Sequence, residues 1–485
     1  MCDNNYKEVI KAMDMKSKEQ MIHEAAMEIL QEVGVVFHND EAVRILKENG
    51  IRVEDNTAFF TEEQVMHWVR MAPSSFTLYA RNPKYNMTIG GDKVNAAPAY
   101  GCAFIAERDG TKRPGTIADY VKCARLVQEA EVYDINGGIT IQPCDVSDDT
   151  APVDMFYATV LNSDKVIMLS TGNKNIMEAL MKAGCEMFGG EEAMAEKPRM
   201  ITLINTNSPL SLDGRMLDCL MTLAKYGQPV ILCPAAMLGV TGPLPIAGTL
   251  ASGTAEDLAG IALAQMIRPG TPVLFGMQSN AIDMKGMIFA CGSPEGALIQ
   301  GWGARMARFY NLPSRGGGSQ TDAPVVNVQA GYESMLTFYS AQSNGINLVM
   351  EAGGIVDSVN ATSFDKLVVD IDIIRQVKIA TAPPEVNEET IDMEEIKDCG
   401  HDGSFLTCDY TLDNFMDLYM PHIGARGAKG SDYIEENIDK EIAQMLETHA
   451  QHGPKLDEDV KNRVKALLVK ETGISVEQLE HIETL

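Results

Sequence analysis

Short apolar runs alternate with helix-length amphipathic segments through the middle of the chain. Eight such runs occur between residues 96 and 380, about 30–40 residues apart. Apolar runs that alternate with helices in this way are typical of β–α units on a parallel sheet. Eight consecutive units favour an α/β fold of the (β/α)8 (TIM) barrel type over a doubly wound sheet. The runs lie at 99–106, 134–142, 165–171, 199–205, 229–235, 272–277, 313–319 and 346–354, and the glycine-rich seventh is assigned from its spacing alone.

The chain before the barrel has a different pattern. Three segments carry apolar residues at helical spacing, and Ser17 and Thr61 precede two of them as candidate N-caps. Two β-like pieces follow between residues 75 and 94 and predict a hairpin. We therefore expect an N-terminal helical cap and hairpin over 1–95, with helices within 17–34, 39–50 and 61–73.

The character changes again after residue 380. A Pro-Pro pair opens a strongly acidic stretch, which predicts a linker with an exposed helix. Three amphipathic segments follow and predict a C-terminal helical annex. The expected organisation is therefore the cap over 1–95, a catalytic barrel over 96–380, and the acidic linker and annex over 381–485, with annex helices within 431–449, 456–473 and 476–485.

Charge and composition exclude several classes of protein. The 40 Lys and Arg against 68 Asp and Glu give a net charge of −28, which argues against binding nucleic acid or an anionic membrane. No apolar stretch is long enough to span a membrane, and the start has no apolar segment typical of a secretory signal. The ten cysteines are scattered without a C-x-x-C pair, as is usual for free thiols in a reducing compartment. We expect a cytoplasmic protein.

Sequence motifs for bound cofactors and metals are missing. The chain contains neither a phosphate-binding P-loop nor a dinucleotide fingerprint, and it has no G-x-S-x-G or H-E-x-x-H motif. None of its eight histidines falls within the predicted barrel core. Cys399, His401 and Cys408 would make an incomplete zinc site, because a structural zinc needs a fourth ligand. We expect no bound metal and no tightly bound organic cofactor.

Polar but mostly uncharged residues follow the predicted strands, at the end where barrel active sites form. They include no Ser-His-Asp triad, no Schiff-base lysine and no nearby histidine base, which disfavours acyl transfer, aldol chemistry and proton abstraction. Each Asn or Gln alone would equally suit a hydrogen-bonded loop. Together they suggest a pocket that positions its substrate, and they are Tyr100, Gln142, Ser170, Thr171, Asn205, Asn207, Cys233, Gln278, Arg315, Asp322 and Glu351.

A long connection after the fifth run, 235–258, is nearly uncharged. It is either buried cover for the pocket or a docking surface for a large flat ligand or a partner. Its candidate docking residues are Gly239, Gly242, Pro243, Pro245 and Gly248.

Several of these stretches resemble the trimethylamine methyltransferase-like proteins, in the branch without pyrrolysine. The resemblance extends over nearly the whole chain, although the family's frequent His-Phe-Arg near the C-terminal motif is replaced by Asn414, Phe415 and Met416. The stretches are AAPAYGCAF (96–104), NTNSPL (205–210), CPAAMLGVTGPLPIAGTLA (233–251), QSNAIDMKGM (278–287), GGSQTDAPVVNVQAGYES (317–334) and FLTCDYTLDNF (405–415).

The resemblance implies methyl transfer from a quaternary amine to the cobalt(I) of a separate corrinoid-binding protein, which brings its own cobalt corrinoid. Glycine betaine, proline betaine, carnitine and γ-butyrobetaine are the candidate substrates. Such a substrate already has a neutral amine as its leaving group and cobalt(I) is the nucleophile, so the protein needs only to position the methyl group. The expected substrate contacts are aromatic faces from Tyr100, Phe104 and Tyr332, negative charge from Asp322 and Glu351, and polar contacts from Gln142, Asn205, Gln278 and Arg315.

Two other interpretations stay open from the sequence. A barrel lyase or isomerase acting on a small polar substrate would need a base at a strand end, and only Glu351 qualifies. A non-catalytic partner of a corrinoid protein would have a mouth loop without a polar pocket beneath it. Whichever interpretation holds, the methyltransferase included, we expect a homo-oligomer.

Overall fold

The computed structural model describes residues 16–427 and 433–485. Residues 1–15 of the predicted cap, and the start of the first predicted annex helix at 431–432, lie outside the described residues. The boundaries of the three predicted domains stay a prediction.

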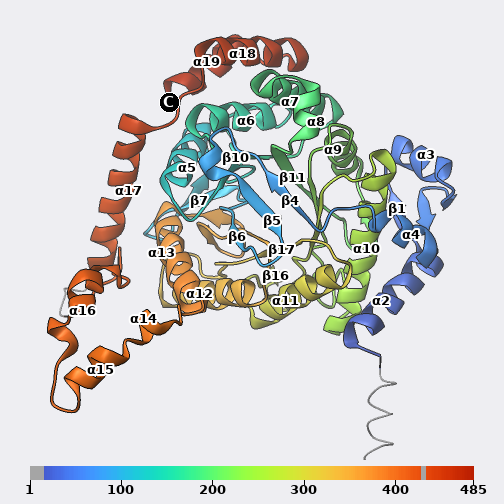
Figure 1. The fold of residues 1–485 in the computed structure, drawn as a ribbon. Helices are drawn as coiled ribbons and strands as arrows, with labels where there is room; N and C mark the ends of the chain where they lie inside the picture. Colours follow the sequence, from blue (N-terminus) through green and yellow to red (C-terminus); the bar gives the residue numbers. More distant parts are fainter. Residues whose placement is uncertain (1–15, 428–432) are drawn as a thin grey trace, which may run out of the picture.

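Eight parallel strands form the centre of the molecule (Figure 1). Seven neighbouring pairs are hydrogen-bonded in the order β6-β18-β17-β14-β13-β11-β10-β9, and a parallel bridge between Ala96 and Tyr133 joins the two ends. The predicted barrel is therefore confirmed, including its glycine-rich seventh strand. The strands are β6 (Asn95–Ala96), β9 (Ile135–Gly137), β10 (Val166–Leu169), β11 (Met200–Asn205), β13 (Val230–Cys233), β14 (Val273–Gly276), β17 (Ser314–Gly317) and β18 (Leu348–Met350).

Helices surround the barrel, and most begin where a short polar side chain caps the first turn. Thr116, Asn173 and Asp213 each accept a hydrogen bond from a main-chain N–H of the helix that follows, as N-caps do. The helices are α5 (Ile117–Glu129), α6 (Ala151–Asn162), α7 (Lys174–Phe188), α8 (Glu191–Glu196), α9 (Gly214–Lys225), α10 (Ile246–Ile267), α11 (Pro294–Phe309), α12 (Val328–Ser343) and α13 (Phe364–Thr381).

The first barrel strand is shorter and earlier than predicted. The apolar run 99–106 was expected to form it, but the barrel uses β6 instead. Gly101 has a φ of 96°, a conformation that favours glycine, and there the chain turns out of the barrel. The end of the run becomes β7 (Phe104–Ala106), in a small sheet with β8 (Lys112–Pro114), β19 (Ile355–Val356) and β20 (Ala361–Thr362).

The N-terminal hairpin closes the end of the barrel where the strands begin. β4 (Ser75–Leu78) and β5 (Met87–Gly90) pair antiparallel, as predicted. Leu78 and Ile89 are fully buried in a cluster with inward-facing strand residues such as Val166. Any opening for a substrate therefore lies at the other end.

The cap explains why α10 is so apolar. α2 (Lys18–Glu28) and α4 (Glu62–Val69) pack on α10 from outside, and the barrel packs on it from inside (Figure 1). Ser17 and Thr61 cap α2 and α4 as predicted. The cap is completed by a π-helical turn (Ile29–Val33), α3 (Asp40–Glu48), β1 (Val35–Phe37), β2 (Arg52–Glu54) and β3 (Thr57–Phe59), with β12 (Ser211–Leu212) joining its sheet.

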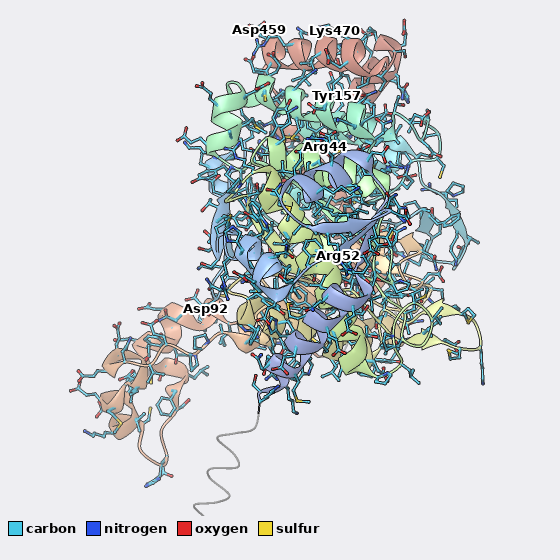
Figure 2. The ribbon with its side chains drawn as sticks, turned by 90° about the vertical axis from the view of Figure 1, so that its right-hand side faces the viewer. Arg44, Arg52, Asp92, Tyr157, Asp459 and Lys470 are labelled. Atoms are coloured by element: carbon cyan, nitrogen blue, oxygen red, sulfur yellow. The ribbon has the colours of Figure 1, made fainter. Side chains whose placement is uncertain are left out.

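The C-terminal annex lies against the barrel helices. α17 (Tyr433–His452) packs on α5 and α13, α18 (Glu458–Thr472) on α7, and α19 (Val476–Thr484) on α6. Between α13 and α17 the chain projects from the body and carries α14 (Glu388–Ile391), α15 (Met393–Cys399) and α16 (Asp409–Asn414) (Figure 2). No described helix is long and apolar enough to cross a membrane.

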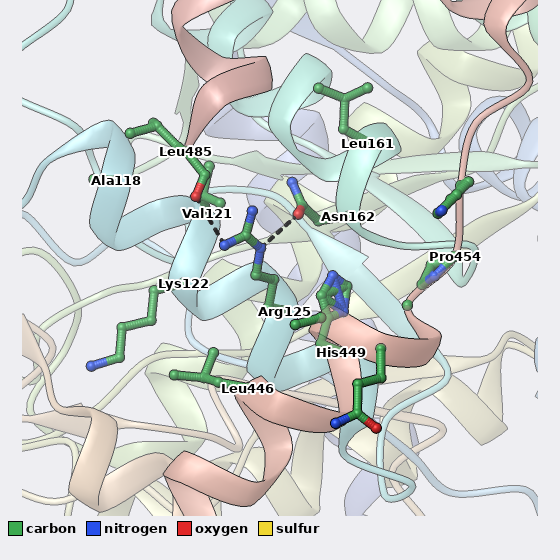
Figure 3. A pocket seen from close by; sticks show the side chains of 14 residues that line it. Ala118, Val121, Lys122, Arg125, Leu161, Asn162, Leu446, His449, Pro454 and Leu485 are labelled. Atoms are coloured by element: carbon green, nitrogen blue, oxygen red, sulfur yellow. Dashed lines mark hydrogen bonds between the residues drawn. The ribbon is translucent and has the colours of Figure 1, made fainter.

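A cavity of about 550 Å³ lies between the annex and the barrel helices (Figure 3). Arg125 Nη1 donates to the main-chain oxygen of Leu485 at 3.0 Å, and its Nε donates to Asn162 Oδ1 at 2.9 Å. His449 Nδ1 lies 3.3 Å from Glu129 Oε1. These contacts attach the annex to α5 and α6, so we assign this cavity to packing.

Candidate active site at the mouth of the barrel

A second cavity, of about 380 Å³, lies where the barrel strands end. Asn205 and Cys233 end β11 and β13, Glu351 directly follows β18, and the side chain of Arg315 reaches the cavity from within β17. Because parallel strands end on one face, residues that are distant in the chain converge there. Five of the nine predicted substrate contacts line this cavity, namely Tyr100, Asn205, Gln278, Arg315 and Glu351.

A buried ion pair forms the floor of the cavity. The Arg315 guanidinium forms a salt bridge with Glu351, and Arg315 Nη1 donates to Gln278 Oε1 at 2.7 Å and contacts Cys233 Sγ at 3.1 Å. Gln320 Nε2 lies 3.4 Å from the second carboxylate oxygen of Glu351. Arg315 is 1% exposed and Glu351 4% exposed. Such a pair is retained in a low-dielectric site because each charge balances the other.

Burial changes the acid–base behaviour of this floor. Desolvation raises the pKa of Glu351 above its ordinary value, and Arg315 offsets part of that rise. Burial also raises the pKa of the Cys233 thiol to about 12, despite the nearby guanidinium. Cys233 is therefore a neutral thiol near pH 7 and a poor nucleophile.

Aromatic rings form part of the cavity wall. Tyr100 is buried, and its hydroxyl lies 3.4 Å from the carbonyl oxygen of Leu169. Gly138 has a φ of 74°, and a Cβ there would lie 2.8 Å from the Tyr100 ring, so this turn requires glycine. Phe289 lines the cavity from the hairpin that follows β14. That hairpin consists of β15 (Ile282–Asp283) and β16 (Ile288–Phe289).

Two amide side chains complete the polar lining. Gln278 accepts from Arg315 through its oxygen, and its Nε2 has no hydrogen-bond partner within residues 16–427 and 433–485. Asn205 ends β11 and lines the same space, and its side chain likewise makes no hydrogen bond within the described chain. Both amides can therefore donate to an anionic group of a ligand.

A loop in an uncommon backbone conformation borders the cavity. Asp357, Ser358 and Val359 have φ values of 54°, 55° and 72°, and Ser358 and Val359 line the cavity. Three consecutive non-glycine residues in this region are held there by surrounding contacts. One such contact is the hydrogen bond of 2.9 Å from Ser358 Oγ to Asp322 Oδ1.

Four predicted contacts lie outside the cavity. Phe104 is in β7, outside the barrel strands, because the chain turns at Gly101. Tyr332 lies on α12, no residue of which lines the cavity, and 60% of its surface is exposed. Asp322 holds the 357–360 loop and accepts from Gly292 N at 3.3 Å. Gln142 is also absent from the lining, whereas the strand-end residues Thr171 and Cys233 belong to it.

The connection after β13 is shorter than predicted. The loop extends only to Pro245, because α10 begins at Ile246 and places Gly248 in its first turn. Most of the second half of 235–258 is uncharged because it is a helix buried between barrel and cap. Leu238 N donates to Asn280 O at 3.0 Å, which joins the remaining loop to the loop after β14 at the mouth.

Two residues of the site had no signal in the sequence: Phe289, which lines the cavity, and Gln320, whose side chain approaches Glu351 from behind the lining. Phe289 lies in a short hairpin whose position depends on the packing of the loops, and its neighbours show no motif. Gln320 follows the glycine-rich strand and differs from other loop amides only in being fully buried. Within the described chain no cluster of three or more His, Cys, Asp or Glu side chains is arranged to hold a metal ion.

Comparisons with solved structures support the same architecture. The crystal structure of the hydroxylamine MtmB complex superposes with a TM-score of 0.51 over 96% of this chain and 87% of that chain. The crystal structure of the monomethylamine methyltransferase MtmB of Methanosarcina barkeri also has a TM-score of 0.51. Sequence identity is 11% and 10%, so these likenesses concern the fold alone.

Comparisons of sequence are more specific. The glycine betaine methyltransferase of Desulfitobacterium hafniense (strain Y51) is 37% identical over 463 residues, which cover 94% of this chain and 96% of that protein. The trimethylamine methyltransferase MttB1 of Methanosarcina mazei is 30% identical over 93% of each chain. A family model described as trimethylamine methyltransferase (MTTB) matches residues 3–473. With nearly its whole length matched, the chain belongs to the trimethylamine methyltransferase (MTTB) family.

Proposed function

We propose that this protein is a methyltransferase that moves a methyl group from a betaine-type quaternary amine to the cobalt(I) of a separate corrinoid protein. Family membership and the glycine betaine methyltransferase relative support methyl transfer. The observation that carries the substrate class is the cavity floor, where Arg315 and Glu351 place opposite charges side by side under aromatic walls.

A betaine matches this floor because it carries one positive and one negative group. Its ammonium would lie against the faces of Tyr100 and Phe289 and near the Glu351 carboxylate, because cations bind aromatic faces and opposite charge. Its carboxylate would accept from the side-chain NH2 groups of Asn205 and Gln278, which have no partner in the part of the chain that the structure describes. Trimethylamine has no carboxylate to occupy the amides, so we propose a betaine in preference to a simple methylamine.

The transfer itself requires no proton donor. Cobalt(I) attacks one methyl carbon, the C–N bond breaks, and its electron pair stays on nitrogen as the neutral tertiary amine. The cobalt supplies the electron pair of the new bond and becomes methyl-cobalt(III). What the protein contributes is a fixed orientation of the methyl group toward the mouth and exclusion of water.

The rim of the mouth is the proposed docking surface for the corrinoid protein. Val240 and Leu244 of the loop after β13, and Met284, Met287 and Ile288 of the β15–β16 hairpin, are all exposed there. Apolar and methionine-rich rims of this kind suit contact with a partner. The glycines and prolines predicted for docking, Gly239, Gly242, Pro243, Pro245 and Gly248, shape this rim.

A substrate panel tests the proposal. The protein would be incubated with reduced corrinoid protein and, separately, with glycine betaine, proline betaine, carnitine, γ-butyrobetaine and trimethylamine. We expect methyl-cobalt(III) and an equal amount of tertiary amine from at least one betaine. Transfer from trimethylamine alone would contradict the betaine class, and no transfer from any of the five would favour a lyase, an isomerase or a non-catalytic partner.

A further inference from the structure

The segment between α13 and α17 exposes an unusual amount of apolar surface. We call residues 384–418 the arm. Of the 29 large hydrophobic side chains that are exposed in the described chain, eleven lie among these 35 residues. No arm residue is buried. The arm therefore leaves most of its large apolar side chains uncovered by its own subunit.

The arm is nevertheless anchored where it leaves and rejoins the body. It follows α13, which ends at Thr381. Immediately after it, the hydroxyl of Tyr419 donates to Asp372 Oδ1 of α13 at 2.5 Å. Beyond that, Ile423 is buried against Val368 and Ile438. The projecting position of the arm is thus fixed at both ends.

A second apolar surface lies on the outer face of α12. Val328, Tyr332, Leu336 and Tyr339 recur at spacings of four, four and three residues, so they share one face, and all are exposed. The only charged residue of α12 is Glu333, which is nearly buried and accepts from Thr321 Oγ1 at 2.6 Å. This outer face is therefore apolar and uncharged on a protein whose net charge is −28.

Charge indicates what the arm can contact. The arm has eleven acidic residues against one lysine, so two arms would repel each other and most of the acidic body would repel an arm. The outer face of α12 carries no such charge. An acidic arm could pack on this apolar face without repulsion from like charges, so the outer face of α12 suits contact with an arm.

The direction of the arm separates it from the proposed corrinoid docking surface. In Figure 2 the arm projects to the left of the molecule, whereas the yellow β15–β16 hairpin, which marks the mouth, projects to the right. A partner at the mouth would leave the arm uncovered. A second copy of the chain carries the surface that the arm requires.

We propose that the protein forms a two-fold symmetric dimer in which the arm of each subunit packs on the outer face of α12 of the other. Such a reciprocal exchange closes on itself, as isologous interfaces do. Half-exposed apolar side chains present roughly 100 Å² each, so the arm and α12 together offer on the order of 1,500 Å² per subunit. This exceeds the roughly 800 Å² per partner of a standard stable interface.

The mass of the full chain in solution is the first test. Sedimentation equilibrium at low micromolar concentration should give twice the mass of one chain. Leu336→Glu on α12 and Leu406→Glu in the arm should each raise the dimer dissociation constant by roughly tenfold or more, because each places a charge in an apolar contact. Val33→Glu changes an exposed hydrophobic residue of the cap and is the matched control. Thermal unfolding of each variant checks that it is folded.

Cross-linking identifies the contact itself. A photoreactive amino acid in place of Tyr332, in a mixture of isotopically heavy and light chains, should give heavy–light cross-links to peptides of the arm. A monomeric wild type, a larger closed ring, a dimer unaffected by both glutamate variants, or cross-links only within one chain would each overturn the proposal.

Discussion

Single aromatic side chains of the cavity should determine how tightly the ammonium group of a substrate binds. Tyr100→Ala removes an aromatic face. A desolvated cation–π contact is worth about 2 kcal/mol, which corresponds to a roughly thirtyfold change in a binding or rate constant. We expect that loss in kcat/KM for the betaine. Tyr100→Phe keeps the face and should change kcat/KM little. Equal losses in both variants would assign the effect to the hydroxyl, and wild-type kinetics in Tyr100→Ala would remove Tyr100 from the substrate site.

The burial of Glu351 predicts that KM for the betaine depends on pH. Because burial raises its folded-state pKa, the carboxylate becomes neutral at a higher pH than an ordinary glutamate. KM for the betaine should therefore rise as pH falls through that raised pKa, since the negative charge near the ammonium is lost. Glu351→Gln keeps the shape without the charge, so it should show a high KM that is independent of pH over the same range. A wild-type KM that stays constant on acidification would contradict this role.

The residue scale also shows what the sequence could reveal about the site. Tyr100, Asn205, Gln278, Arg315 and Glu351 were predicted because strand ends converge in any barrel, and strand ends are visible as the ends of apolar runs. Phe104 and Tyr332 were proposed as aromatic faces for a cation, but Phe104 lies in the small outer sheet beyond the turn at Gly101 and Tyr332 lies on the exposed face of α12. Phe289 could not be predicted, since its place over the cavity depends on how two loops pack.

At the scale of elements, spacing predicted more than propensity. The seventh strand, Ser314–Gly317, has little strand propensity, yet the repeat required a strand there and the structure has one. The first strand was misplaced because the run 99–106 is interrupted by the turn at Gly101. The start of α10 was missed because a helix buried on two sides has no amphipathic pattern to mark it.

The contact between α6 and α19 makes a prediction about stability. Gln478 Nε2 of α19 donates to both carboxylate oxygens of Asp154 of α6 at 2.8 Å. Burial raises the pKa of Asp154 to about 7. A raised folded-state pKa contributes stability that is complete below the unfolded pKa near 4 and is lost as pH rises through about 7.

Asp154→Asn should remove the loss of folding stability that the wild type shows as pH rises. We expect this variant to be more stable than the wild type at pH 8 by about 1–3 kcal/mol and to differ less at pH 5.5, as measured by urea unfolding. Asp148→Asn, at an exposed position, is the matched control. A variant less stable at pH 8 than at pH 5.5, relative to the wild type, would show that folding does not raise the pKa of Asp154.

In the whole molecule, the proposed surfaces for substrate binding, corrinoid-protein docking and dimer formation lie at three different places. The hairpin of β4 and β5 closes one end of the barrel, so that substrate and corrinoid protein must both approach the other. The betaine would bind beneath the mouth, and the corrinoid protein would dock on the rim above it. The arm and α12 lie on other surfaces, which leaves the mouth of each subunit free in the proposed dimer.

We propose that substrate and corrinoid protein occupy separate levels of one mouth, and a two-dimensional kinetic titration distinguishes these two levels. Methyl transfer would be measured while the betaine and the corrinoid protein are varied independently, in Glu351→Gln and in Leu244→Glu on the rim. We predict that Glu351→Gln raises KM for the betaine with little change in the dependence on corrinoid protein, and that Leu244→Glu does the reverse. If Glu351→Gln altered only the dependence on corrinoid protein, or if both variants behaved as the wild type, the proposed arrangement of the site would be wrong.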